Sequence, residues 1–310
     1  MKIKHLFGPV SSRRLGISLG IDLVPHKTCT LDCVYCECGK TTNLAVERRE
    51  YVPTAEILDE LKNYLDENPE LDYITFSGSG EPTLHSGLGE IINFLKQNYP
   101  KYRVAVLTNG TLFHDKKLRD EVKKADLVIP SLDAASEEFF WEINRPHGNL
   151  NLNEIIKGLI ELRREFPGEI WLEIFIVPGL NDTDFELQKI KNIIEKINPD
   201  KIQLNTLDRP GTEEWVMPAE KKKLEGITSL LDAEIIAEFK SRKKIKSFSK
   251  DIEENIISTL RRRPCTAQDL SDIPGIHLNE VNKYLGALLA SGKIKQIRGK
   301  RGLFFRILND

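Results

Sequence analysis

The sequence contains no apolar run long enough to cross a bilayer, and residues 1–16 include no apolar segment followed by a small-residue cleavage site. We therefore expect a cytoplasmic protein without a membrane partner. Net charge is also small, −2 at pH 7, so the chain as a whole is not expected to attract polyanions. With 310 residues and 40% hydrophobic side chains, the chain can form one large domain and a small one.

Cysteine is scarce except in one short segment. Cys265 stands alone, whereas Cys29, Cys33, Cys36 and Cys38 lie within ten residues. A total of five is odd, and this clustering is not how a secreted disulfide framework is arranged. In a reducing compartment the cluster indicates metal binding.

Short β-branched or apolar runs alternate with amphipathic segments of helical period, which is typical of βα units around a parallel sheet. Six strands are predicted, over residues 17–24, 73–77, 103–108, 127–132, 170–177 and 201–204. Helices are predicted between them, over residues 54–66 with Thr54 as the N-cap, 88–98, 116–124, 152–165 and 185–197. Six units are two short of a closed eight-fold barrel. The sequence therefore predicts the α/β class and an open, partial (β/α)6 TIM-like barrel with its chemistry at the carboxyl ends of the strands.

The pattern changes after residue 211. We predict a barrel over residues 1–213, an extension and basic linker over 214–250, and a small domain over 251–310. The extension is expected to contain a helix over 219–231 and a strand over 234–239. In the small domain we expect helices over 252–263, 266–270 and 278–291 and a hairpin through 299–302. This order resembles a winged helix-turn-helix domain.

The cysteine segment has CxxxCxxC spacing and places Cys29, Cys33 and Cys36 on one loop after the first predicted parallel strand. Three thiolates can hold three irons of a cubane cluster and leave the fourth iron without a protein ligand. If that iron chelates the amino and carboxylate groups of S-adenosylmethionine (SAM), an electron can enter the nearby sulfonium. The C–S bond then breaks to give a 5'-deoxyadenosyl radical.

This spacing, with Tyr35 just before the last cysteine, resembles the signature of the radical SAM superfamily, and the resemblance covers residues 5–215. It implies an enzyme with two cofactors, a 4Fe-4S cluster on Cys29, Cys33 and Cys36, and SAM. It also implies a reducing electron donor of the flavodoxin or ferredoxin type.

Further matches follow at the ends of later predicted strands. Residues 77–83, Ser-Gly-Ser-Gly-Glu-Pro-Thr, are similar to the superfamily's Gly-Glu motif, whose backbone receives the amino group of SAM. Glycines suit a ligand that approaches the main chain. The resemblance implies polar contacts to the methionine or ribose portion after strands three and four, and adenine packing after strands five and six. The cofactor-binding residues that it implies are Tyr35, Gly78, Gly80, Glu81, Asn109, Ser131, Asp133, Val177 and Asn205.

A narrower resemblance is to uncharacterised iron-sulfur oxidoreductases near the wyosine-forming radical enzymes of transfer RNA. The residues that carry it lie in segments 8–16, 18–22 and 144–147. Ser11 stands where that branch usually has proline. The substrate is left open.

Zinc is the alternative metal for the cysteines. The pair Cys33 and Cys36 is half of a zinc knuckle, and Cys38 or His26 would complete four ligands. No second CxxC pair lies at zinc-ribbon spacing, however. Cys38 is otherwise an incidental thiol, a ligand of a second cluster or a redox group, and Cys265 is interpreted as a small packing residue.

Several of these residues also have a structural interpretation. Glu81 can be a helix-entry carboxylate, and Asp133 can be a cap of the segment 136–143. Arg13 and Arg14 are either a solvated pair or ligands for an anionic substrate or the cofactor's carboxylate.

The predicted hairpin region is basic and carries Lys293, Lys295, Arg298, Lys300, Arg301 and Arg306. Such a surface commonly meets nucleic-acid phosphate, although the predicted recognition helix, 277–286, is poor in positive charge. The sequence therefore predicts a radical SAM enzyme that modifies a macromolecular substrate, RNA or protein. The alternatives are an iron-sulfur, redox-sensing DNA-binding regulator and a zinc-stabilised binding module.

Overall fold

The computed structural model describes residues 4–236, 252–272 and 278–308. Its main element is an eight-stranded sheet of order β1-β2-β5-β6-β7-β8-β9-β10. Strand β1 (Leu6–Ser12) is antiparallel to β2 (Gly16–Ile21), and all later neighbours pair in parallel. Those later strands are β5 (Tyr73–Phe76), β6 (Arg103–Thr108), β7 (Leu127–Pro130), β8 (Glu169–Phe175), β9 (Lys201–Asn205) and β10 (Glu234–Ile235). The predicted α/β class with a mostly parallel sheet is confirmed.

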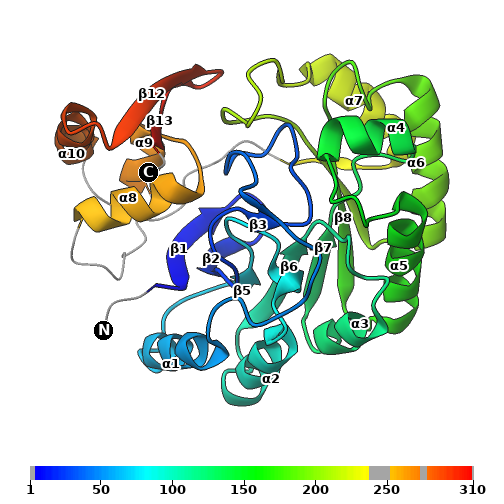
Figure 1. Cartoon of the computed structure of the whole chain (residues 1–310), viewed down its shortest axis with the longest axis horizontal. Helices are drawn as coiled ribbons and strands as arrows, with labels where there is room; N and C mark the ends of the chain where they lie inside the picture. Colours follow the sequence, from blue (N-terminus) through cyan, green and yellow to red (C-terminus); the bar gives the residue numbers. More distant parts are fainter. Residues whose placement is uncertain (1–3, 237–251, 273–277, 309–310) are drawn as a thin grey trace.

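Six helices form an arc around the outside of this sheet (Figure 1). They are α1 (Thr54–Leu65), α2 (Leu88–Asn98), α3 (Lys116–Val122), α5 (Leu152–Glu165), α6 (Asp184–Ile197) and α7 (Lys221–Leu231). Each buries an apolar face in one core shared with the strands; in α1 this face is formed by Ile57, Leu61 and Leu65. The arrangement fits the predicted partial barrel. In the described part of the chain, no helix combines the length and apolar character needed to span a membrane.

Two local expectations were incomplete or wrong. Strand β1 was not predicted, and it adds an antiparallel neighbour to β2. Thr54 is not the N-cap of α1, because Pro53 holds that position and makes no side-chain cap hydrogen bond. The backbone N–H of Thr54 instead donates to the Glu50 carboxylate at 2.8 Å, so a side chain before the helix supplies the missing acceptor. The predicted strand over 234–239 is present as β10, and residues 237–239 lie outside the described residues.

The C-terminal unit, residues 252–272 and 278–308, has its own small core. Its elements are α8 (Ile252–Arg262), β11 (Cys265–Thr266), α9 (Ala267–Asp272), α10 (Leu278–Ala290), β12 (Ile294–Gly299) and β13 (Gly302–Ile307). The strands form a three-stranded antiparallel sheet of order β11-β13-β12. Leu260, Leu285 and Phe305 pack in its core together with buried Cys265, as predicted for that cysteine. In Figure 1 this unit lies beside the β1 end of the large sheet.

Candidate active site

The cysteine loop, residues 29–42, connects β3 (Thr28–Cys29) to β4 (Asn43–Leu44). All its thiols are free and partly exposed. The loop is tightly turned, because the N–H of Cys36 donates to the carbonyl of Cys33 and the N–H of Gly39 donates to the carbonyl of Cys36, both at 3.1 Å. The three predicted metal ligands are therefore carried by one short segment, with Cys29 at the end of β3 and Cys33 and Cys36 on the turn that follows.

Cys36 lies against a buried cation. The ammonium of Lys27, only 3% exposed, donates to its sulfur at 3.1 Å. A hydrogen bond from the Cys38 thiol and the charge of Lys27 lower the pKa of Cys36 to about 5, against the effect of burial. The thiolate, which is the form that binds metals, is thus favoured at this position.

Cys29 and Cys33 each have an amide donor from a distant segment. The side-chain nitrogen of Asn109 lies 3.5 Å from the sulfur of Cys29, and that of Asn144 lies 3.4 Å from the sulfur of Cys33. Burial raises the pKa of Cys29 to about 12 and also raises the pKa of Cys33. Metal binding at these thiols must therefore release protons.

The arrangement of these side chains also bears on the zinc alternative. Among residues 4–236, 252–272 and 278–308, no three His, Cys, Asp or Glu side chains converge on a position where one metal ion could be held. The ligands of a cubane bind separate irons and do not need to meet at one point.

The glycine loop, residues 77–83, packs onto the cysteine loop. Gly78 has a φ of +123°, and a Cβ there would lie 1.8 Å from the Asp22 carboxylate. A Cβ on Gly80 would lie 2.2 Å from the carbonyl oxygen of Thr28. Both glycines are therefore required by contacts within the protein itself, in addition to any contact with a cofactor.

Glu81 is buried, and its carboxylate joins the ends of two strands. It accepts hydrogen bonds from the N–H and hydroxyl of Thr83, from the Thr108 hydroxyl at 2.6 Å and from the N–H of Asn109 at 2.8 Å. It is also the N-cap of the short helix η1 (Pro82–Leu84), as the helix-entry interpretation expected. Burial raises the pKa of Glu81, and these hydrogen bonds oppose the rise. The side chain is fully engaged by its neighbours.

Asp133, after β7, is the centre of a second buried network. Its carboxylate accepts hydrogen bonds from the Tyr35 hydroxyl at 2.5 Å, the Asn144 amide at 2.8 Å and the Phe175 N–H at 2.9 Å. The rings of Tyr35 and Phe175 stack with centroids 3.7 Å apart. Burial raises the pKa of Asp133 to about 6, although these donors favour its ionised form.

Four of the predicted cofactor residues, Tyr35, Asn109, Ser131 and Asp133, line one cavity of about 20 Å³. They come from the cysteine loop and from the ends of β6 and β7. Asp133 does not cap the helix that follows, because Ser136 is its N-cap. The structure therefore brings these sequence-distant residues together.

The last two predicted cofactor residues lie farther along the sheet. Val177 is buried in an apolar cluster with Val34 of the cysteine loop. The amide of Asn205 donates to Glu173 at 3.2 Å, and the same carboxylate forms an ion pair with Arg14. Arg14 is therefore not a solvated charge, and Glu173 is a site residue that the sequence did not reveal.

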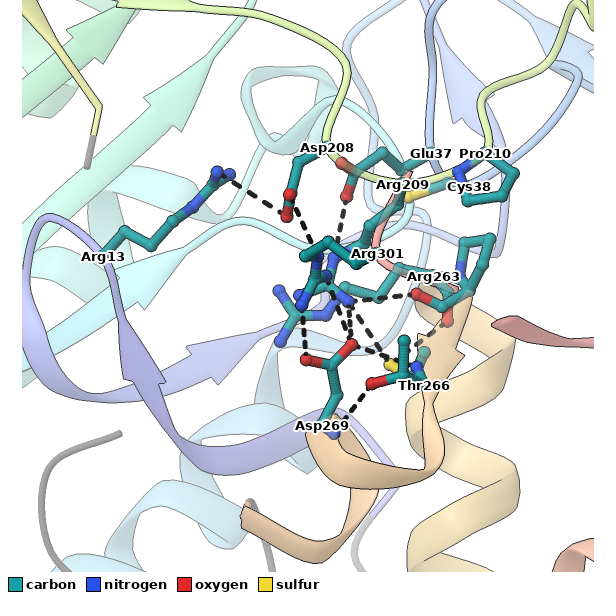
Figure 2. A network of polar contacts seen from close by, with 12 residues as sticks. Arg13, Glu37, Cys38, Asp208, Arg209, Pro210, Arg263, Thr266, Asp269 and Arg301 are labelled. Atoms are coloured by element: carbon teal, nitrogen blue, oxygen red, sulfur yellow. Dashed lines mark hydrogen bonds and ion pairs between the residues drawn. The ribbon is translucent and has the colours of Figure 1, made fainter. Parts of the chain in front are cut away.

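The C-terminal unit is joined to the barrel by arginine–carboxylate contacts (Figure 2). Arg209 donates to Asp269 at 2.6 Å and lies 3.5 Å from Glu37 of the cysteine loop. Arg301 pairs with Asp269 at 2.9 Å and with Asp208 at 3.0 Å. Although burial opposes it, the charges of Arg209 and Arg301 hold the pKa of Asp269 at about 2. The carboxylate is thus ionised and paired at neutral pH.

Two more arginines of the C-terminal unit reach the loops of the candidate site. Arg262 donates to the carboxylate of Asp22 at 2.9 Å, and the other oxygen of Asp22 accepts from the N–H of Ser79 at 3.2 Å. Arg306 donates to the carbonyl of Glu37 at 3.0 Å. The C-terminal unit therefore touches both the glycine loop, through Asp22, and the cysteine loop.

The sequence model of the radical SAM superfamily matches residues 23–187. The chain is 39% identical over 300 residues to a protein of Brachyspira hyodysenteriae named GTPase Obg, covering 96% of this chain and 44% of that protein, so it spans less than half of that relative. It is 32% identical over 315 residues to the UPF0026 protein MJ1312 of Methanocaldococcus jannaschii, covering 96% of this chain and 94% of that protein.

Among solved structures, a radical SAM methyltransferase from Sphaerobacter thermophilus aligns with a TM-score of 0.54 at 15% identity. The alignment covers 70% of this chain and 65% of that one. At this identity the likeness concerns the fold alone, and it agrees with the mostly parallel sheet described above.

Proposed function

The chain belongs to the radical SAM superfamily and to the UPF0026 proteins, and on this premise we propose that Cys29, Cys33 and Cys36 hold its 4Fe-4S cluster for modification of a macromolecular substrate. The protein is an enzyme whose cofactors are the cluster and SAM, and it requires a reductant. The observation that carries the ligand assignment is the single loop, residues 29–42, on which Cys29, Cys33 and Cys36 are free and partly exposed.

The donor set fits the cluster. Three thiolates would leave one iron without a protein ligand and free to bind SAM, and the bound cluster would supply reductive cleavage of SAM. The chain's own contribution is to hold the thiolates. The ammonium of Lys27 and the amides of Asn109 and Asn144 donate to the three sulfurs, and such donors orient metal ligands and tune their basicity.

We further propose that SAM lies across the strand ends, between the glycine loop and the end of β9. The backbone at Gly78 and Gly80 would receive its amino group. Glu81 would act through Asn109, because its carboxylate is already engaged by the N–H of that residue. The remaining proposed contacts are Tyr35, Ser131, Asp133, Val177 and Asn205.

The C-terminal unit is proposed to be a winged helix-turn-helix domain that recruits the substrate. Its order α8-β11-α9-α10-β12-β13, with a hairpin after the third helix, supports this proposal. The proposed divisions remain a barrel over 1–213, an extension and linker over 214–250 and the winged helix over 251–310. The basic hairpin places RNA ahead of protein as the substrate class. A flavodoxin or ferredoxin is proposed as the electron donor.

The test is anaerobic purification and reconstitution, followed by iron and zinc analysis and a dithionite-driven assay for 5'-deoxyadenosine. We expect about four irons per chain and release of 5'-deoxyadenosine with methionine. The Cys33→Ala variant should lose SAM cleavage, whereas Cys265→Ala, in the core of the C-terminal unit, should retain it. Stoichiometric zinc, or turnover by Cys33→Ala, would contradict the proposal.

A further inference from the structure

A pocket of about 430 Å³ lies between the cysteine loop and the C-terminal unit. Its barrel side includes Cys38 and Thr212, and the hydroxyl of Thr212 donates to the carbonyl of Cys36 at 3.1 Å. The pocket wall is therefore in direct contact with the main chain of a proposed cluster ligand. The cations that line the pocket are Lys40, Arg261, Arg263, Lys295 and Arg306.

The acidic residues of the pocket do not neutralise these cations. Only two carboxylates are in its lining, Glu37 and Glu213. Glu37 lies 3.5 Å from Arg209, and Glu213 pairs with Arg145 at 2.5 Å. Arg209 and Arg145, the arginines that these two carboxylates contact, lie outside the pocket lining. The lining itself therefore has an excess of positive charge.

Three of the pocket cations differ from the acidic residues in their pairing. Within the part of the chain that the structure describes, Arg261, Arg263 and Lys295 have no carboxylate partner in an ion pair. Lys295 and Arg306 stand directly opposite one another in the register of β12 and β13. Like charges at such a pair are destabilising. An anion bound between them would remove this repulsion.

We propose that this pocket binds backbone phosphates of a single-stranded nucleic-acid segment of the substrate. The inference rests on the proposed radical SAM function and names its substrate class. A strand fits better than a lone phosphate, because exposed Lys300 at the hairpin tip lies beyond the pocket, at the far end of β12 from Lys295. A six-residue strand such as β12 spans roughly 20 Å, which exceeds the reach of one phosphoryl group.

Two exposed tryptophans favour nucleic acid over an acidic protein. Trp141 is 48% exposed and Trp215 is 53% exposed. Both are close in sequence to residues that bond to Val34 of the cysteine loop. Trp141 precedes Ile143 by two residues, and the carbonyl of Ile143 accepts from the N–H of Val34 at 2.9 Å. Trp215 follows Glu213 by two residues, and the N–H of Glu213 donates to the carbonyl of Val34 at 3.0 Å. Bases of a single strand stack on exposed aromatic rings while the phosphates meet cations. Glu213 also lines the pocket, so the exposed ring of Trp215 and the pocket cations come from neighbouring segments.

The test uses the full-length, anaerobically reconstituted protein and a fluorescein-labelled oligouridylate of about twelve nucleotides, with binding followed by fluorescence anisotropy over a salt series. The double variant Arg261→Gln/Lys295→Gln removes two proposed phosphate contacts. It should bind about tenfold more weakly than the wild type, and its slope of log K against log salt should be shallower by about 1.4. The matched control is Lys157→Gln, an exposed lysine of α5, which should bind like the wild type. Equal salt slopes for the double variant and the wild type would overturn the inference.

Further arms of the same assay identify the occupant. Trp215→Ala should weaken binding about fivefold or more, and affinity should rise with oligonucleotide length. Full displacement by inorganic pyrophosphate without any length dependence would mean a phosphorylated small molecule, and equal displacement by polyglutamate would mean an acidic protein; either would overturn the inference. 5'-Deoxyadenosine release without oligonucleotide binding would overturn this inference alone, whereas binding without release would overturn the proposed function alone.

Discussion

The strand ends of the barrel and its junction with the C-terminal unit differ in the groups that pair with their carboxylates. Glu81 and Asp133 are satisfied by hydroxyl, amide and backbone donors that carry no charge. At the junction, Asp22, Asp208 and Asp269 are paired with arginines. The apolar cores of the two regions are also separate clusters.

This difference predicts that the stability of the two regions responds differently to salt and pH. Neutral hydrogen bonds inside a core fix geometry with little dependence on salt, whereas ion pairs respond to pH and, at the partly exposed Asp22 and Asp208, are also screened by salt. We therefore expect the strand-end site to be stable as part of the barrel and the C-terminal unit to be released by milder perturbations. The following predictions test this contrast, starting with the largest effect.

Asp133→Ala should have the largest effect on stability. It leaves the donors of Tyr35, Asn144 and Phe175 buried without an acceptor, and we expect the free energy of unfolding to fall by about 3 kcal/mol or more. Denaturant unfolding of the apoprotein measures this change. Asp59→Ala, at an exposed position of α1, is the matched control and should be nearly neutral. A wild-type midpoint for Asp133→Ala would show that the network does not stabilise the barrel.

Arg209→Ala should loosen the junction while leaving the barrel intact. Asp269 keeps Arg301 as a partner, so we expect a loss of about 2 kcal/mol in the docking of the C-terminal unit. Hydrogen exchange should accelerate in α8 and α9 and stay unchanged in β5 to β8. Lys283→Ala, an exposed lysine of α10, serves as the control. Equal acceleration in the barrel strands would contradict the contrast.

Acidification should affect the two regions in opposite directions. Because the pKa of Asp133 is raised to about 6, its protonation favours the folded barrel, and this contribution to stability grows as pH falls from about 6 to 4. Because the pKa of Asp269 is held at about 2, its contribution to docking is complete above pH 4 and is lost as pH falls from about 4 to 2.

The comparison of wild type with Asp133→Asn and Asp269→Asn isolates these contributions from those of other groups. Hydrogen exchange at each pH separates the barrel from the C-terminal unit. Parallel pH profiles for the wild type and Asp269→Asn between pH 4 and 2 would argue against a paired Asp269.

Arg262→Ala should give the smallest effect, a few-fold weaker affinity for SAM. Arg262 supports Asp22, and Asp22 in turn accepts from the N–H of Ser79 in the glycine loop. Loss of the two charged hydrogen bonds from Arg262 to Asp22 acts on the glycine loop only indirectly and should alter its geometry only slightly. Equilibrium dialysis with labelled SAM measures the affinity, and iron content should not change. Lys283→Ala is again the control, and equal affinities for the two variants would remove Arg262 from this role.

The sequence predicted what depends on local pattern. The six strands paired in parallel, the helices between them and the elements of the C-terminal unit follow from period and spacing over short windows, and they were confirmed apart from boundary shifts. The crowding of Cys29, Cys33 and Cys36 on one short segment likewise depends on local spacing. Strand β1 was missed because it has no helix of its own and joins the sheet only through its antiparallel neighbour β2.

Contacts between distant segments were beyond the sequence. Asn144 and Cys33 are 111 positions apart, and Arg14 and Glu173 are 159 positions apart. No local pattern signals such a pairing, which depends on how the strand ends converge. Gly78 was predicted to be required as a glycine because a cofactor approaches the main chain there. In the structure the group that approaches Gly78 is the carboxylate of Asp22.

The central claim is that three cysteines bind the cluster and leave one iron for SAM, with Cys38 outside the ligand set. Electron paramagnetic resonance of the reduced, reconstituted protein, recorded with and without SAM, tests it directly. We expect the signal of the wild type and of Cys38→Ala to change when SAM is added, and the signal of Cys36→Ala to be lost or unresponsive to SAM. A SAM-responsive signal in Cys36→Ala together with its loss in Cys38→Ala would contradict the assignment.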